Sequence, residues 1–354
     1  MPTLILPRAT TAHPFAHWLV NKAYKAAVRE GFTPRELRLP VPPIEHPSIL
    51  SEAARLGMVC TQGRVPDLSP TNALVAFLAG TGEATPRFLS LALPPEAKLT
   101  DWHAHTQFAY CGRGIDLFDA ASLSLTLGVQ VQGFSEHAFA LYFPGDALKF
   151  YWQSDPDFVA RCWAEKGRGR MVAYKAMVAQ ARQLFGTRVR FGLEVDLFGG
   201  GQFCLAPEDL EGWDMLIGAI HEVEGVNAAT PQAEAEVAWM RDVERLLTYP
   251  IKILAHPFRY WPWGHRPVPR HLYKPVARML AQAGVAAEIN HHKNPFELDF
   301  FRDCLEEGVK ISLGTDAHIT RDIADLQPHL QTLDALGINT PELRAKHLFA
   351  AEQE

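Results

Sequence analysis

The chain has 354 residues, enough for one large domain with an extension or for two domains. Its content of 47% hydrophobic and 21% charged residues is ordinary for a globular protein. The formal charge of −6 gives no bulk electrostatic reason to expect a nucleic-acid-binding or membrane-binding protein.

The cysteines and the N-terminus indicate the compartment. Five cysteines are scattered along the chain without a Cys-x-x-Cys pair, which is typical of reduced thiols rather than a disulfide framework. The N-terminus has no basic leader followed by a long apolar stretch, and nothing approaches transmembrane length. We therefore expect a cytoplasmic protein without membrane association.

Residues 1–97 differ in composition from residues 98–354. Thirteen of the 26 prolines fall in this first part. A helix is expected over 15–30, a second short helix is expected to be capped by Ser48, and residues 73–79 form an apolar run of ambiguous type. We interpret the first part as a Pro-rich, partly helical accessory segment that packs on the main domain or forms a homo-oligomer contact.

From residue 99 onward, short apolar runs alternate with helical stretches, which is typical of a parallel α/β fold. Seven β/α units predict a TIM-like (β/α)7 barrel, whose active site lies at the carboxyl ends of the strands. The expected strands are 99–104, 129–135, 189–195, 214–220, 251–255, 285–289 and 309–314. The expected helices are 116–127, 156–185, 231–247, 270–283, 296–307 and 321–336.

Each expected strand ends in residues that can bind a metal. His103 and His105 point to the same side if they follow one strand, because strand side chains alternate. Imidazoles and carboxylates together suit borderline divalent cations. The residues at the seven ends are His103 and His105, Glu136 and His137, Glu194 and Asp196, His221, His256, Asn290 to His292, and Asp316 and His318.

These segments resemble, in order, the motifs of the PHP (polymerase and histidinol phosphatase) superfamily, in its histidinol-phosphatase branch. Asp101-Trp102-His103-Ala104-His105-Thr106 is similar to the opening D-x-H-x-H-T motif. The other similar segments are Phe134 to His137, Gly192 to Asp196, Ile217 to His221, Ala255 to Pro257, Glu288 to Asn290 and Gly314 to His318. The resemblance covers about residues 99–330.

The resemblance implies a distorted (β/α)7 barrel of PHP type with two or three divalent metals, for which Zn, Mn and Fe are alternatives. Glu194 would bridge the first two metals. The first would also be held by His103, His105 and Asp316, the second by His221 and His256, and the third by His137, His318 and a loop histidine.

The loop that should supply this last histidine reads Tyr110-Cys111-Gly112-Arg113. Arg113 stands where the histidine is expected, and a guanidinium cannot bind a cation. Either Cys111 substitutes as the ligand, or Cys111 is a small buried residue and the third site is weak or empty.

The implied activity is phosphoric ester hydrolysis. Two metals that share a carboxylate lower the pKa of a water held between them, and the resulting hydroxide can attack phosphorus. Glu194 and Asp316 would belong to this catalytic centre, with His137 and His318 as proton donors if the third metal is absent. Asp101 and Asp196 either orient imidazoles or have surface and capping roles.

Positive side chains near the metals would recognise phosphate. The candidates are Arg113, Arg259 and Lys293, grouped with the neighbouring Asn290. Each cation has the alternative role of pairing with a nearby acid.

Three functions remain open. The leading one is a phosphomonoesterase of histidinol-phosphatase type acting on a small-molecule phosphate ester. The alternatives are a PHP phosphodiesterase or exonuclease acting on nucleotides, and a non-catalytic metal-binding PHP module. The acidic balance and the lack of a basic stripe disfavour long nucleic acids.

Overall fold

The computed structural model describes residues 2–66, 71–80, 85–111, 114–142, 161, 164, 167–292 and 297–350. The chain divides into two compact units. The first unit comprises Met1–Pro95 and Thr126–Gly128, and the second comprises Glu96–Leu125 and Val129–Glu354.

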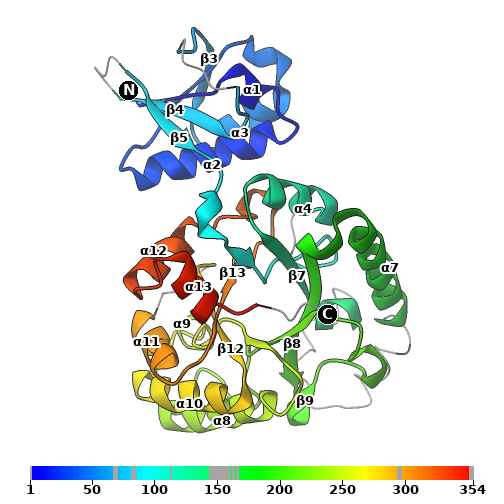
Figure 1. The fold of residues 1–354 in the computed structure, drawn as a ribbon. Helices are drawn as coiled ribbons and strands as arrows, with labels where there is room; N and C mark the ends of the chain where they lie inside the picture. Colours follow the sequence, from blue (N-terminus) through cyan, green and yellow to red (C-terminus); the bar gives the residue numbers. More distant parts are fainter. Residues whose placement is uncertain are drawn as a thin grey trace. The chain divides into compact units, whose positions relative to one another are not determined.

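The first unit is built on a five-stranded mixed sheet with the strand order β3-β2-β1-β4-β5 (Figure 1). Strand β1 pairs in parallel with β2 and antiparallel with β4. The strands are β1 (Thr3–Ile5), β2 (Glu36–Leu39), β3 (Val59–Gln62), β4 (Val75–Ala79) and β5 (Arg87–Ser90). The helices are α1 (Arg8–Thr11), α2 (Ala16–Arg29) and α3 (Pro47–Arg55).

The helix expected over 15–30 is confirmed as α2, and the ambiguous run over 73–79 contains strand β4. The description of this part as only partly helical was incomplete, because it missed four other strands. Each has only three or four residues, too few to show a clear alternation. Ser48 is not a cap, because α3 begins one residue earlier, at Pro47.

The second unit contains seven parallel strands in the order β13-β12-β11-β10-β8-β7-β6, with the antiparallel β9 attached to β8. The backbone N–H of Trp102 donates to the carbonyl of Leu313 at 2.8 Å, which nearly closes the sheet between its first and last strands. The strands are β6 (Thr100–Asp101), β7 (Val131–His137), β8 (Val189–Phe198), β9 (Gln202–Phe203), β10 (Met215–Ala219), β11 (Ile253–Leu254), β12 (Ala286–Asn290) and β13 (Ile311–Gly314).

Helices surround these strands, so the predicted TIM-like α/β barrel is confirmed (Figure 1). The helices are α4 (Leu117–Thr126), α5 (Ala138–Tyr142), α7 (Arg168–Phe185), α8 (Gln232–Leu246), α9 (Tyr260–Trp263), α10 (Tyr273–Ala283), α11 (Leu298–Glu306), α12 (Gln327–Ala335) and α13 (Pro341–His347). In the described part of the chain, no helix is both long enough and apolar enough to cross a membrane.

Barrel closure leaves little room between neighbouring strands. A Cβ atom added to Gly314 at the end of β13 would collide with Oε1 of Glu288 and would lie 2.7 Å from Cβ of His103. Only a glycine therefore fits at this point. The close approach brings the carboxyl ends of β6, β12 and β13 together.

Candidate metal centre

The predicted metal-binding residues converge at the carboxyl ends of the barrel strands. His103 and His105 follow β6, His137 ends β7, and Glu194 and Asp196 lie in β8. His221 follows β10 and His256 follows β11, whereas Asp316 and His318 follow β13. The side chains of all these residues except His221 and His318 are buried. Parallel strands end at the same edge of a barrel, which is why residues far apart in the sequence meet here.

The first group consists of Nε2 of His103, Nε2 of His105, Oε2 of Glu194 and Oδ1 of Asp316. The His103 nitrogen lies 3.5 Å from the Glu194 oxygen and 3.8 Å from the Asp316 oxygen. The His105 nitrogen lies 3.8 Å and 3.0 Å from the same two oxygens. Four lone-pair-bearing atoms therefore face one small buried volume.

The second group uses the other oxygen of Glu194. Its Oε1 lies 2.9 Å from Nε2 of His256 and 3.5 Å from Nε2 of His221. The carboxylate of Glu194 thus turns one oxygen to each group, as a bridging ligand does.

The donor set fits divalent cations in both groups. Bonds of about 2.0–2.2 Å from one cation to N and O ligands require those ligands to be roughly 3–3.5 Å apart. The observed spacings of 2.9–3.8 Å between the donor atoms are close to this requirement. Moreover, Nε2 of His103 is buried and has no hydrogen-bond partner. A cation would satisfy this atom, whereas leaving it unpaired costs free energy. Oε2 of Glu194 lies 2.6 Å from Nδ1 of His137, so this imidazole also faces the carboxylate.

Buried carboxylates contact Nδ1 of three of the imidazoles. Nδ1 of His103 donates to Glu288 at 2.9 Å, and Nδ1 of His105 donates to Glu136 at 3.3 Å. Nδ1 of His221 lies 2.8 Å from Asp196. These contacts leave Nε2 of each ring free for a cation and fix the ring orientation.

The orienting roles of Glu136 and Glu288 were not anticipated, although both residues lie in the quoted motifs. The available signal was a carboxylate close to the carboxyl end of a strand. Of the two roles left open for Asp101, the structure shows the capping one, because its carboxylate accepts the backbone N–H groups of His103 and Thr315 at 3.2 Å and 3.0 Å. Burial raises the pKa of Asp101 to about 6.

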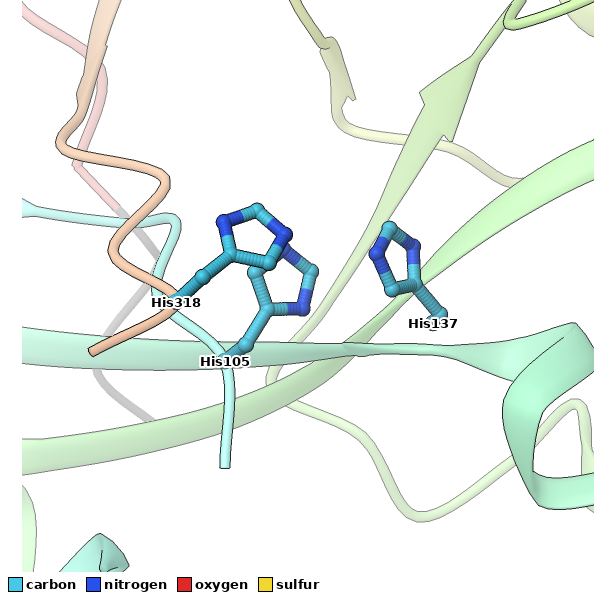
Figure 2. Close-up of side chains that lie close together, drawn as sticks. All are labelled: His105, His137 and His318. Atoms are coloured by element: carbon cyan, nitrogen blue, oxygen red, sulfur yellow. The ribbon is translucent and has the colours of Figure 1, made fainter. Parts of the chain in front are cut away.

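His105, His137 and His318 form a third group, with candidate ligand atoms all within 4.8 Å of one another (Figure 2). The ring centroid of His105 lies 4.1 Å from those of His137 and His318, which are 5.8 Å apart. Sγ of Cys111 lies 3.5 Å from Nε2 of His137. The structure therefore brings together the described residues that were predicted for a third site.

The charged groups of the centre shift one another's pKa values. Burial would raise the pKa of Glu194, but the imidazoles of His137, His103 and His221 outweigh it and hold that pKa well below its usual range. Burial would lower the pKa of His105, yet Asp316 and Glu136 raise it to about 9. Without a metal, His105 thus holds a proton at neutral pH that a cation must displace.

Two ligand candidates adopt a backbone conformation that is rare outside glycine. His256 has a φ of 62° and Asp316 a φ of 51°. Such residues cost of order 1 kcal/mol or more and are concentrated at functional sites. His256 belongs to the second group of ligand atoms, and Asp316 belongs to the first.

The candidates for phosphate binding have different surroundings. Arg259 is buried and its Nη2 donates to Oδ2 of Asp316 at 2.5 Å, which is the acid-pairing alternative. The amide nitrogen of Asn290 donates to Glu288 at 3.0 Å and to Asp316 at 3.2 Å. Arg113 and Lys293 lie outside the described residues.

A cavity of about 260 Å³ opens beside His221. Four aromatic side chains, together with one carboxylate, line this space. The lining residues are Tyr110, Phe139, His221, Glu222, Tyr260, Trp263 and Gly264. A small organic group can therefore lie next to the metal centre.

Comparison with known proteins adds one relative. A protein named "Probable phosphatase" from Syntrophotalea carbinolica is 30% identical to this chain over 164 residues. The match covers 44% of this chain and 63% of that protein, which is less than two thirds of its length. No family model matches the chain. This similarity and the buried cluster support a hydrolase with a site that can hold metal ions.

Proposed function

We propose that this protein is a metal-dependent phosphomonoesterase of the histidinol-phosphatase type, within the PHP superfamily. The observation that carries the proposal is the position of Glu194. Its two oxygens face two separate sets of histidine and carboxylate ligands, 2.9 Å from His256 on one side and 3.5 Å from His103 on the other. Similarity to a relative named as a probable phosphatase supports phosphate esters as substrates.

When bound, two cations would supply an activated hydroxide and neutralise charge on the phosphoryl oxygens. The chain's own contribution is to fix their positions. Glu288, Glu136 and Asp196 each hold one imidazole, so that Nε2 of each ring points into the centre. Arg259 and Asn290 hold Asp316 through its second oxygen. Ligands held in this way need little reorganisation during the reaction.

The cavity beside His221 favours a small organic ester over a long nucleic acid. Its volume of about 260 Å³ suits one compact group. Its described lining contains one carboxylate, Glu222, and no lysine or arginine. Binding of a polyphosphate backbone needs several cationic side chains, and this lining does not supply them. We therefore place the alcohol part of the ester in this cavity.

The test is hydrolysis of phosphate esters by protein stripped with a chelator and reloaded separately with Zn²⁺, Mn²⁺ or Fe²⁺. A panel of phosphomonoesters, including histidinol phosphate, is compared with phosphodiesters and single-stranded DNA. We expect monoester hydrolysis that is lost on chelation and restored by metal. Glu194→Gln should reduce kcat by roughly 100-fold or more, because one carboxylate oxygen becomes an amide nitrogen without a lone pair for a cation.

Glu52→Gln is a suitable control, since Glu52 is a buried carboxylate of the first unit that pairs with Arg55 at 2.6 Å. It should leave hydrolysis unchanged. If metal-loaded protein hydrolyses diesters or single strands but no monoester, the phosphodiesterase alternative holds. If it binds metal and hydrolyses nothing, the proposal is wrong and a non-catalytic metal-binding module is left.

A further inference from the structure

Cys111 lies beside the third group of imidazoles and has no role in the two groups that Glu194 joins. Its Sγ is 3.5 Å from Nε2 of His137, and the side chain is partly buried. His137 and His318 face the same volume in Figure 2. The sulfur therefore lies at the edge of a cluster that can bind a cation.

His105 cannot complete this third group if it belongs to the first. Its Nδ1 faces Glu136 at 3.3 Å, and its Nε2 faces Oδ1 of Asp316 at 3.0 Å. An imidazole nitrogen has one lone pair and binds one cation, so Nε2 of His105 is used in the first group. The third group is then left with His137 and His318. Catalytic sites for zinc and similar ions use three protein ligands, so one ligand is missing.

The distance from Cys111 to His137 matches the one expected for two ligands of the same cation. Bonds of about 2.3 Å to sulfur and about 2.05 Å to nitrogen, at a tetrahedral angle, put the two atoms roughly 3.5 Å apart. The observed distance between Sγ of Cys111 and Nε2 of His137 is 3.5 Å. On the other side, Nδ1 of His318 lies 2.7 Å from the carbonyl oxygen of Asp316. That nitrogen carries the proton, so Nε2 of His318 is left as a ligand atom.

The family resemblance implies a third cation position at His137 and His318, and we propose that the sulfur of Cys111 is its missing ligand. The thiol proton is released to solvent when the sulfur–metal bond forms. A thiolate is a soft ligand and selects Zn²⁺, Co²⁺ or Fe²⁺ over Mn²⁺ and Mg²⁺. The inference extends the proposed function by defining the metals of the same centre, but its test does not depend on hydrolysis.

The experiment is spectroscopic and uses the full chain loaded with Co²⁺ alone. A thiolate bound to Co²⁺ gives an intense sulfur-to-cobalt charge-transfer band in the near ultraviolet, which imidazole and carboxylate ligands do not give. Cobalt content is measured on the same samples after removal of free metal. The wild-type protein should show the band and bind three cobalt ions per chain.

Two substitutions at the same position separate ligation from packing. Cys111→Ala should lose the band and one cobalt ion per chain while keeping the other two. Cys111→His should lose the band but keep three ions, because an imidazole replaces the sulfur. Cys60→Ser is the control, since Cys60 is another partly buried cysteine, in the first unit, and should leave both readouts unchanged. Circular dichroism checks that each variant is folded.

The proposal is overturned if the wild-type protein shows no charge-transfer band after loading. It is equally overturned if folded Cys111→Ala keeps the band or keeps all the cobalt of the wild type. Hydrolysis is recorded separately on the same preparations. A cobalt–sulfur band in a protein that hydrolyses no ester would contradict the phosphatase proposal and leave the ligand assignment standing.

Discussion

Glu288 and His103 form a buried pair in which Oε1 of the carboxylate lies 2.9 Å from Nδ1 of the imidazole. The two residues are 185 positions apart in the sequence and come from β12 and from the end of β6. The contact fixes which ring nitrogen of His103 is free, and that nitrogen faces Glu194 at 3.5 Å. The metal centre therefore depends on a residue that touches none of the proposed cations.

Replacing Glu288 should weaken metal binding without removing a ligand. In Glu288→Gln the neutral amide holds His103 less strongly, and changes of this kind cost about 10- to 100-fold in metal affinity. The measurement is competition with a chromogenic chelator at pH 7. Asp242→Asn alters another buried carboxylate, on helix α8, and should bind metal as the wild type does. Equal affinities for wild-type protein and Glu288→Gln would show that Glu288 has no orienting role.

The same pair predicts the effect of a methyl group at Gly314. Gly314→Ala puts a Cβ against the Glu288 carboxylate and 2.7 Å from Cβ of His103. We expect a loss of about 1–3 kcal/mol in the free energy of unfolding, as in other overpacked cores, together with weaker metal binding.

Denaturant unfolding of the metal-free protein checks the first effect, and chelator competition checks the second. Gly169→Ala is the matched control, because its added Cβ meets no atom within 4 Å and the residue lies in helix α7. That variant should be as stable as the wild type or slightly more stable. A Gly314→Ala protein with unchanged stability and affinity would mean that this close approach does not constrain the centre.

The barrel and its ligand-rich rim could be predicted from the sequence because each depends on a local pattern. An apolar run followed by a histidine or a carboxylate is visible without knowing what pairs with it. The partner of His103 could not be predicted in this way, since the contact with Glu288 depends on how β6, β12 and β13 close the barrel. Four strands of the first unit were missed for a related reason: they have three or four residues and are stabilised mainly by their neighbours in the sheet.

Metal binding should stabilise the protein more as the pH rises from about 6.5 to about 9. In the metal-free protein the pKa of His105 is raised to about 9, above its value of about 6.5 in an unfolded chain. That shift stabilises the metal-free fold below pH 6.5, and the contribution is lost as the pH rises through 9. A bound cation needs the neutral imidazole, so its binding competes with the proton less and less over the same window.

The readout is the Tm of metal-loaded protein minus the Tm of metal-free protein, measured at several pH values after free metal has been removed. The subtraction cancels groups that titrate outside the centre. We expect the difference to grow between pH 6.5 and pH 9. A difference that stays constant or shrinks over this range would show that the His105 proton is not coupled to metal binding.

Trp263 lies in the wall of the cavity beside His221, and its substitution should change KM more than kcat. Trp263 lines this cavity and keeps 58% of its surface exposed, so its removal should cost little stability. In Trp263→Ala we expect KM to rise by roughly 5- to 30-fold for phosphomonoesters with a ring or another bulky group, because burying that group stabilises binding by about 1–2 kcal/mol. The kcat should change little, since Trp263 contacts no proposed cation.

Phe88→Ala removes a similarly exposed aromatic ring from β5 of the first unit and serves as the control. Steady-state kinetics on a bulky ester and on methyl phosphate separate an effect on the alcohol part of the substrate from an effect on the metal centre. Methyl phosphate does not reach Trp263 and should keep its KM. An equal rise in KM for both esters would show that Trp263 acts through the metal centre and not through the alcohol part of the substrate.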